Sequence, residues 1–332
     1  MGGMGNVNTE GKISVSVIIP VYNEERYIDG CMRTLIAQTY PREEMEWIVI
    51  DGNSTDRTGE ILARYAENYP LRVLFNEKRV TPMSLNMGVR AASGRYIIRF
   101  DAHASFPPDY IENCVDCLET IEADNVGGYV ETKAEGLVGG AIAKILSSRF
   151  GVGGSAFRTG ERGGYVDTVP FGAFRREVFD RIGLFNEELL RSEDNDINAR
   201  IIASGGKVYL SEKIRSVYYC RDSIPAFLKQ GLQNGNVLFR TIRQNPRAMR
   251  LRHFVPFFFL LSLILLPLIG ISLRPIRWLF LAELAVYLAL DVCFSFFDGS
   301  PDKGIVTLWL YPLYHVTYGL GSLLGLFGIR LC

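Results

Sequence analysis

The chain has 332 residues, 48% of them hydrophobic, and its 36 Lys and Arg residues balance its 36 Asp and Glu residues. This length accommodates one sizeable α/β domain with an appendage, and the neutral balance argues against a nucleic acid or another strongly acidic partner. Five arginines cluster just before the most hydrophobic part of the chain: Arg240, Arg243, Arg247, Arg250 and Arg252. Such a cluster is typical of a segment beside a cytoplasmic membrane surface that carries anionic lipid.

The first hundred residues alternate short apolar runs with amphipathic stretches. The apolar runs are rich in β-branched and aromatic residues and predict strands at residues 14–21, 47–50, 73–75 and 96–100. The amphipathic stretches predict helices at residues 24–38, 54–69 and 82–92. This alternation has the spacing of βαβ units, so we expect an α/β domain with a Rossmann-like, mostly parallel sheet.

Polar residues follow three of these strands at the point where each strand ends. The clusters are Tyr22-Asn23-Glu24, Asp51-Gly52-Asn53-Ser54 and Asp101-Ala102-His103. Ligands of open α/β sheets bind beyond the carboxyl ends of the strands. The three clusters therefore predict a single site.

Asp101 and His103 are the candidates for a metal site. A carboxylate and an imidazole two positions apart, just after a strand, can face one ion that bridges diphosphate oxygens. This donor pair suits Mn²⁺ or Mg²⁺, with phosphate and water as the remaining ligands. The alternative is an Asp that caps a turn beside a surface His, and a three-residue motif alone does not separate the two.

Two further carboxylates have both a chemical and a structural interpretation. Asp51 precedes a glycine and could accept a hydrogen bond from a base or a ribose, although an Asx-turn explains the same residue. Asp194 follows Glu193 at the start of a predicted helix and could accept the proton of a sugar hydroxyl. Helix capping is the alternative there, and one carboxylate can serve both purposes.

Residues 131–168 interrupt the alternation of strands and helices. They are rich in glycine and carry Arg149, Arg158 and Arg162, so we expect a long, mobile insertion near the site. Sheet-like segments return after it at residues 165–169, 208–210 and 217–219.

Residues 224–252 are amphipathic and basic, which predicts helices that lie on a bilayer surface. Their polar side chains, together with Glu193, could contact an acceptor sugar or a lipid diphosphate: Gln230, Gln233, Asn234, Asn236 and Arg240. A solvated helix face explains these residues equally well.

Three hydrophobic segments complete the chain, at residues 254–273, 276–297 and 305–329. Each is long enough to span about 30 Å of hydrocarbon, so we expect a multi-pass membrane region with the α/β domain on the cytoplasmic side. Buried core helices are the alternative. Arg274 and Arg277 run against the positive-inside trend and leave the number of crossings open, and Glu283 and Asp291 fall within the second segment.

The motifs in combination resemble glycosyltransferase family 2, whose members have the GT-A fold. The resemblance covers roughly residues 14–240 and rests on VSVIIPVYNE (15–24), IVIDGNSTD (48–56), NMG (86–88), FDAH (100–103), FGAFR (171–175) and SED (192–194). Within the family, the sequences DAHA (101–104), RDS (221–223) and LRHF (251–254) are similar to the ExoA-like subgroup of succinoglycan glucosyltransferases.

The resemblance implies roles for individual residues. It implies a nucleotide pocket, for uridine in particular, made by Pro20, Tyr22, Glu24, Asp51, Asn86 and Asp101. Asp101 occupies the first acidic position of the family's metal-binding D-x-D motif, and His103 replaces the second Asp. Asp194 matches the catalytic base of the family.

The implied reaction is an inverting transfer of glucose or a similar hexose from a nucleoside-diphosphate sugar to a polyprenyl-diphosphate-linked glycan, in exopolysaccharide or cell-surface polysaccharide synthesis. The Q-x-x-R-W motif of processive members is absent, because Gln230 is followed by Gly231, Leu232, Gln233 and Asn234. We therefore expect one sugar per encounter.

These features divide the chain into a flexible N-terminus (1–13), a GT-A domain (14–222), interfacial helices (223–253) and a transmembrane region (254–332). Two alternatives are a nucleotidyltransferase on a similar sheet and a non-catalytic membrane scaffold. The first usually has a Gly- and Lys/Arg-rich loop after the first strand, where this chain has Tyr22-Asn-Glu-Glu25. The second rests only on His103 in place of an Asp.

Overall fold

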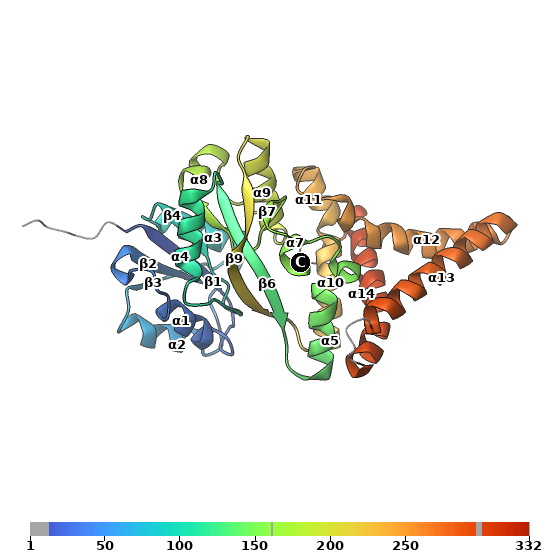
Figure 1. The fold of residues 1–332 in the computed structure, drawn as a ribbon, viewed down its shortest axis with the longest axis horizontal. Coiled ribbons are helices and arrows are strands. Elements are labelled where there is room, and N and C mark those ends of the chain that lie inside the picture. Colours follow the sequence, from blue (N-terminus) through green and yellow to red (C-terminus); the bar gives the residue numbers. More distant parts are fainter. Residues whose placement is uncertain (1–12, 161, 297–300, 332) are drawn as a thin grey trace, which may run out of the picture.

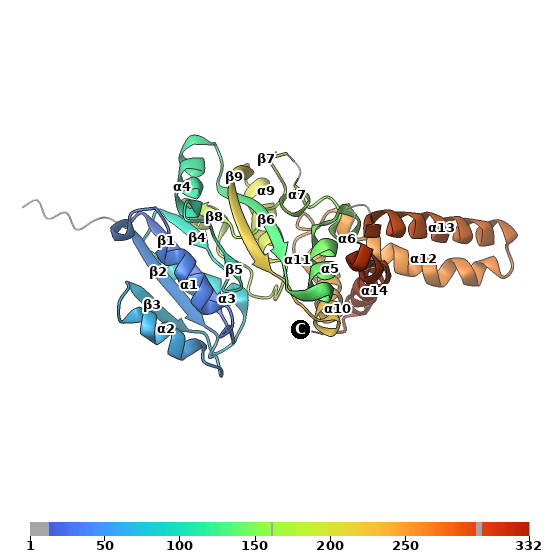
Figure 2. The ribbon, with the colours of Figure 1, turned by 60° about the horizontal axis from the view of Figure 1, so that its bottom comes forward.

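A computed structural model describes residues 13–160, 162–296 and 301–331 (Figure 1). All but the last residue of the predicted flexible N-terminus, 1–13, lie outside this part of the chain. The α/β half contains the sheet, and a helical half extends from it to a projecting pair of helices, as both ribbon views show (Figures 1 and 2).

Four parallel strands form the first half of the sheet in the order β3-β2-β1-β4. They are β1 (Val15–Val21), β2 (Met45–Asp51), β3 (Leu71–Phe75) and β4 (Tyr96–Arg99). Their β-branched side chains fill the core on both faces of β1 and β2, as expected for strands between two helical layers. The predicted parallel arrangement is confirmed, and all four strands end at the same edge.

Helices cover both faces of this sheet. One hydrophobic cluster includes α1 (Ile28–Ile36), α2 (Thr58–Ala66) and α4 (Tyr110–Thr120). The other includes α3 (Thr81–Ala91), α8 (Glu177–Ile182) and α9 (Glu193–Ala203). The apolar residues of α1 recur at helical spacing, which is why one stripe of this helix is buried and the rest faces solvent.

The second half of the sheet is mixed, in the order β8-β6-β9-β5, with β7 also paired to β9. Its strands are β5 (Ala104–Ser105), β6 (Asn125–Lys133), β7 (Gly164–Tyr165), β8 (Ala173–Arg175) and β9 (Val208–Tyr219). The two short strands expected at 208–210 and 217–219 form the single long strand β9, which runs parallel to β6. Each antiparallel pairing involves only two or three residue pairs, so the sheet is mostly parallel.

The insertion expected at residues 131–168 is largely helical. It contains α5 (Gly136–Ser147), α6 (Arg149–Val152) and α7 (Ala156–Thr159). The side chains of Ala141, Ile142 and Ile145 on α5 are buried in a third hydrophobic cluster with Phe227 and Tyr311. This packing joins the insertion to the C-terminal helices.

Helix α10 (Ile224–Asn236) packs closely on α14 (Pro301–Leu326), and α11 (Leu238–Gln244) follows it. Glycines bring the two backbones together, because a Cβ at Gly235 would lie 2.0 Å from the carbonyl oxygen of Tyr318. The apolar face of α10 is therefore covered by protein, which differs from the interfacial helix expected at residues 223–253. One side of α14 is buried in this contact while Ile305, Trp309 and Leu313 are exposed, so the membrane segment expected at 305–329 stays a prediction.

This contact gives a stability prediction. The substitution Gly235→Ala forces α10 away from α14, and overpacking of this kind costs about 1–3 kcal/mol of unfolding free energy. Gly30→Ala on α1 is the matched control, since nothing lies within 4 Å of its added Cβ and Ala favours a helix by about 0.5–1 kcal/mol over Gly. Thermal unfolding in detergent should show a lower melting temperature for Gly235→Ala and a higher one for Gly30→Ala. Equal shifts in the two variants would contradict the close contact between α10 and α14.

Helices α12 (Val255–Gly270) and α13 (Arg274–Phe296) form the projecting hairpin in Figures 1 and 2. Within the described residues, α13 is the one helix long and apolar enough to cross a membrane. Helix α12 has 16 residues, roughly 24 Å of helix, which is less than the hydrocarbon thickness. The multi-pass region of three segments expected at 254–332 is therefore not supported.

Candidate active site

A cavity of about 1490 Å³ lies between the carboxyl ends of the parallel strands and the helical half. Residues after β1, β2 and β4 line one end, and α12 and α13 line the other. The first turn of α9 and the helical insertion contribute the walls between them. The strand-end clusters thus share one site with a segment more than 200 residues later in the chain.

The loops after β1 and β2 form the first end of the cavity, with Pro20, Tyr22, Glu24 and Gly52 in its lining. The ring of Tyr22 is 42% exposed, and the guanidinium of Arg79 lies 5.1 Å from its centre. Arg79 also donates a hydrogen bond to the Tyr22 hydroxyl at 3.2 Å. This exposed aromatic face suits a planar base, and Arg79 was missed by the sequence analysis because no motif contains it.

Asp51 ends β2 and forms the Asx-turn that was its alternative interpretation. Its Oδ1 accepts hydrogen bonds from the backbone N–H of Ser54 at 2.9 Å and from the Ser54 hydroxyl at 2.6 Å. The Ser54 hydroxyl oxygen also accepts a bond from the backbone N–H of Asn23 at 2.9 Å. The two strand-end loops are therefore fixed to each other, and Gly52 rather than the Asp51 side chain lines the cavity.

Asn86, like Asp51, is a sequence-predicted nucleotide residue that does not line the cavity. Its side chain is buried, where it donates to the carbonyl of Phe185 and to Glu187 and accepts from the N–H of Phe185. These bonds hold α3 to the loop before α9. Asn86 therefore has a structural role, and its expected nucleotide contact stays a prediction.

Arg99 gathers the acidic residues at the centre of the cavity. Its guanidinium donates to Asp101 at 3.0 and 3.3 Å, to Glu193 at 3.2 Å and to Asp194 at 2.8 Å. Ser192 adopts a left-handed backbone (φ 68°) where the chain enters α9, and Glu193 and Asp194 of its first turn line the cavity. The sequence analysis brought Asp101 and Asp194 to one site but missed the arginine between them.

The surroundings of Asp194 suit a group that exchanges a proton near neutral pH. Burial raises its pKa, the cation of Arg99 lowers it, and the charges of Glu193 and Asp101 raise it, to about 7 in balance. A general base works best when its pKa is close to the operating pH.

His103 lies beside Glu24, with 3.1 Å between its Nδ1 and a carboxylate oxygen. Burial lowers its pKa, but the bond to Glu24 and the nearby charge of Asp101 raise it above its usual value overall. Among the residues described, no group of three or more His, Cys, Asp and Glu side chains could hold a metal by itself. Asp101 and His103 both line the cavity, and one carboxylate with one imidazole fits a divalent cation whose remaining ligands are phosphate oxygens.

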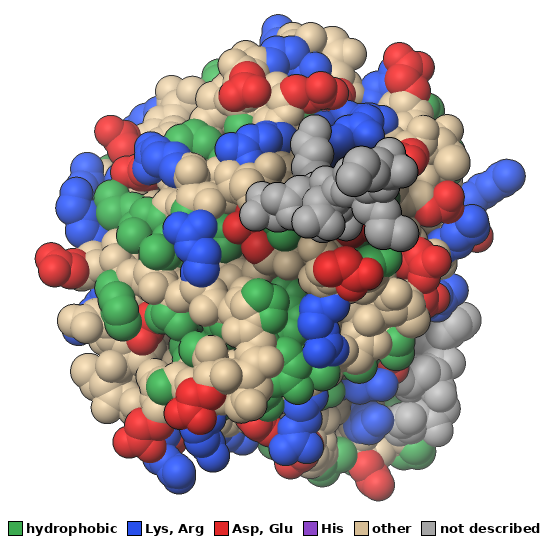
Figure 3. Space-filling model, turned by 90° about the vertical axis from the view of Figure 1, so that its left-hand side faces the viewer, with side chains coloured by type: hydrophobic (Ala, Val, Ile, Leu, Met, Phe, Trp, Pro, Cys, Tyr) green, Lys and Arg blue, Asp and Glu red, His purple; other side chains and the backbone are tan. Residues whose placement is uncertain are grey.

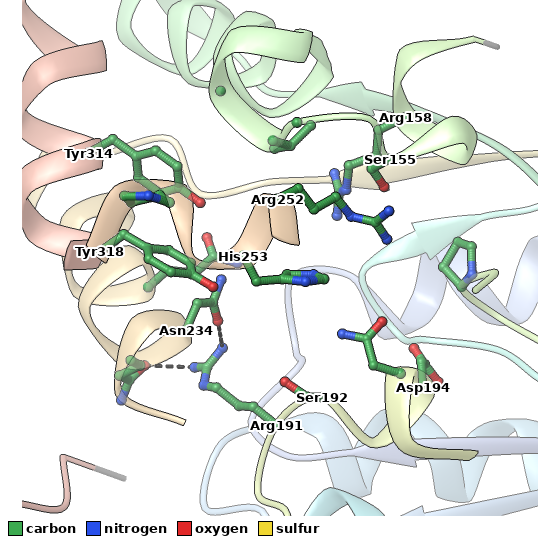
Figure 4. A pocket seen from close by; sticks show the side chains of 18 of the residues that line it. Ser155, Arg158, Arg191, Ser192, Asp194, Asn234, Arg252, His253, Tyr314 and Tyr318 are labelled. Carbon is green, nitrogen blue, oxygen red and sulfur yellow. Dashed lines mark hydrogen bonds between the residues drawn. The ribbon is translucent and has the colours of Figure 1, made fainter. Parts of the chain in front are cut away.

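The residues suggested for acceptor contacts separate into two groups. Gln230 and Gln233 on α10 line the cavity. Glu193 also lines it and forms an ion pair with Arg99. Gln233 accepts a hydrogen bond from Arg191 at 2.7 Å (dashed in Figure 4). Arg240 lies on α11 outside the cavity lining, so its expected acceptor contact is not supported.

Comparisons with known proteins agree with this architecture. A model of the family described as glycosyl transferase family 2 matches residues 16–183. The chain is 30% identical over 299 residues to the dolichyl N-acetyl-alpha-D-glucosaminyl phosphate 3-beta-D-2,3-diacetamido-2,3-dideoxy-beta-D-glucuronosyltransferase of Methanococcus voltae, covering 85% of this chain and 93% of the relative. It is 29% identical over 278 residues to the succinoglycan biosynthesis protein ExoA of Rhizobium meliloti, covering 82% of each.

Solved structures are similar in fold. The mannosyltransferase PcManGT from Pyrobaculum calidifontis, in complex with GDP-Man and Mn²⁺, has a TM-score of 0.63 at 20% identity, covering 95% of this chain and 87% of that one. TarS 1-349 of S. aureus, in complex with UDP-GlcNAc, has a TM-score of 0.50 at 15% identity, covering 96% and 93%. At these identities the likeness supports the GT-A-like fold and nothing finer.

Proposed function

This chain belongs to glycosyltransferase family 2, and we propose that it is an inverting, metal-dependent enzyme that transfers one sugar from a nucleotide sugar to a lipid-linked glycan. The single observation that carries the proposal is the cavity in which Asp101 and Asp194 flank Arg99 beside the exposed ring of Tyr22. Membership of the family removes the support for a nucleotidyltransferase, and no feature of the site favours a scaffold.

The donor occupies the end of the cavity formed by the loops after β1 and β2. The base stacks on Tyr22, and its polar edge faces the loop held by Asp51. Uridine is the proposed nucleoside, and one structural relative was solved with UDP-GlcNAc. Guanosine is the alternative, because another was solved with GDP-Man. Asp101 and His103 would hold a divalent cation, and the bound cation would supply positive charge that stabilises the diphosphate leaving group.

Asp194 is the proposed base. Its carboxylate accepts the proton of the acceptor hydroxyl as that oxygen attacks the anomeric carbon from the face opposite the leaving diphosphate, which inverts the configuration. Arg99 orients this carboxylate through the 2.8 Å hydrogen bond and keeps enough positive charge nearby for it to ionise near pH 7.

The hairpin of α12 and α13 is the proposed membrane attachment. Its outward side chains include Phe258, Leu268, Trp278 and Leu288, all more than half exposed. The opposite end of the molecule differs, because Lys, Arg, Asp and Glu are spread over the face in Figure 3. Exposed apolar helices suit a lipid environment, and the five arginines at 240–252 favour the cytoplasmic leaflet.

A binding and transfer screen tests the function. Full-length protein in detergent would be mixed with UDP- and GDP-sugars in the presence of Mn²⁺, Mg²⁺ or EDTA, and calorimetry would measure the binding of each donor. We expect one nucleotide sugar to bind only with metal and to lose binding in Asp101→Ala but not in Asp194→Ala. Absence of binding to every donor with both metals would refute the proposal.

A further inference from the structure

The wall of the cavity beyond Asp194 carries several cations, and Glu283 of α13 is the carboxylate at its far end. Figure 4 shows Arg158, Arg191 and Arg252 around this part of the cavity, with Asp194 at one side and two tyrosines at the other. Arg252 pairs with Asp167 at 2.8 Å, and Arg191 donates to the side-chain oxygens of two amides. Of the three, Arg158 has the fewest polar partners.

Arg158 is a half-buried cation without a compensating anion. Its guanidinium donates one hydrogen bond, to the Thr132 hydroxyl at 3.2 Å, and lies 5.5 Å from the ring centre of Tyr218. Among the described residues, no carboxylate lies within salt-bridge distance of it, and burial lowers its pKa. Taking a charge out of water without a partner is costly, so such a cation indicates an anionic ligand.

The neighbouring histidine adds no charge. Burial and the cation of Arg252 lower the pKa of His253 to about 4, so its imidazole is neutral near pH 7. Gln230, which also lines the cavity, has a buried side-chain oxygen without a hydrogen-bond partner. An unpaired buried acceptor in the lining of the same cavity is an independent sign that the cavity receives a polar molecule.

The same cavity continues into an apolar groove between the two helices of the hairpin. Phe259 of α12 and Leu279 and Val286 of α13 line it, with Glu283 and Tyr287 as its polar members. The cavity therefore presents, in one continuous space, carboxylates at its centre, an uncompensated arginine beyond them and a hydrocarbon surface at its far end. A molecule that matches all three has a sugar, an anionic group and a long apolar chain.

We propose that Arg158 binds the phosphate of the lipid-linked acceptor, whose hydrocarbon chain lies in the groove between α12 and α13. The inference rests on the proposed function and adds the ligand class, a phosphate or diphosphate ester of a long-chain alcohol. The fork of a guanidinium matches two phosphate oxygens, which suits Arg158 to this ligand. With the phosphate held there, the sugar it carries extends toward Asp194.

The test measures binding of a short lipid phosphate, farnesyl phosphate, to the full-length protein in detergent. Arg158→Gln should weaken this binding about 10- to 100-fold, the range expected when one charged hydrogen-bond partner is removed. Arg162→Gln is the matched control, because this exposed arginine of the same insertion lies outside the cavity lining and its variant should bind normally. Arg158→Lys keeps the positive charge but lacks the two-pronged guanidinium group, so it should lose less affinity for farnesyl phosphate than Arg158→Gln.

Two further probes identify the source of the phosphate. Farnesol should bind more weakly than farnesyl phosphate and equally to the wild type and Arg158→Gln. Inorganic phosphate should also bind more weakly, since it leaves the groove empty, and equal affinity for it would overturn the lipid assignment.

Nucleotide-sugar affinity separates the two proposals. Normal nucleotide binding with unchanged farnesyl phosphate binding in both Arg158 variants would overturn this inference alone. Failure of the wild type to bind any nucleotide sugar would instead overturn the proposed function. Retained nucleotide affinity in a variant also shows that it is folded.

Discussion

Asp194→Asn should reduce the transfer rate by about 10²- to 10⁴-fold, the usual contribution of a positioned general base. The amide keeps the size of the side chain but cannot accept the proton of the acceptor hydroxyl. The affinity for the nucleotide sugar should be nearly unchanged, because the loops after β1 and β2 bind the nucleobase and Asp194 does not contact it. Single-turnover transfer and calorimetry would measure the two quantities separately.

The adjacent acid supplies the control for this prediction. Glu193 also accepts a bond from Arg99 and lines the cavity, but at 3.2 Å it is the more distant partner of the same nitrogen. Glu193→Gln should therefore slow transfer by less than about tenfold. Equal losses in the two variants would indicate that the ion-pair network matters and that Asp194 has no separate role as a base.

Arg99→Met should be the most destabilising substitution in the site. It leaves Asp101, Glu193 and Asp194 without their shared cation, and removing one partner of a buried ion pair costs about 3–5 kcal/mol. The cation of Arg99 lowers the pKa of Asp194, so its removal raises that pKa. The loss should therefore be largest at high pH and should shrink as falling pH protonates Asp194. Melting temperatures at pH 8 and pH 5 would show this trend.

Arg95→Met is the matched control for Arg99. Its partner Glu119 and its own side chain are both more than half exposed, so the substitution should change stability by no more than about 0.5 kcal/mol at either pH. A similar loss in both variants would contradict the special role of the buried cluster.

The pH dependence of catalysis follows from the same residues. The base must be ionised, so kcat/KM should rise with pH and level off above the pKa of Asp194, about 7. Arg99 is the cation that lowers this pKa. In Arg99→Lys the positive charge is less firmly positioned beside Asp194, so the rise of kcat/KM with pH should move to higher pH. A limb at the same pH in both proteins would argue against Asp194 as the titrating group.

The parallel half of the fold was predictable because β1, β2 and β4 are long, β-branched runs whose ends carry the polar clusters. The rule that such ends share one edge correctly placed the clusters at 22–24, 51–54 and 101–103 together, whereas Asp194 entered only through the family resemblance. The strands β5, β7 and β8 were not predictable, since two or three residues carry no periodicity.

The differences at the C-terminus have another physical cause. Hydropathy cannot tell a helix side covered by protein from one surrounded by lipid, so the protein contacts of α14 were not expected. Its glycines at 319, 321 and 325 were the available signal, because they permit the close contacts with α10 and α12 that the structure contains.

Arg99 and Arg158 show which further properties of the site the sequence contained and which it did not. A charged residue inside the buried strand Tyr96–Arg99 requires an opposite charge nearby, and the acids at 101, 193 and 194 were the candidates. Arg158 was noticed only as part of a basic insertion. Its lack of an anionic partner is a three-dimensional property that sequence does not contain.

The most direct test of the central claim is the mass of the lipid-linked glycans in native cells whose gene carries Asp194→Asn. We expect the accumulation of a lipid-linked intermediate that ends just before the sugar added by this enzyme, because later transfers need that sugar as their acceptor. An unchanged glycan in this strain, in a cell where deletion of the gene abolishes the glycan, would contradict catalysis by Asp194.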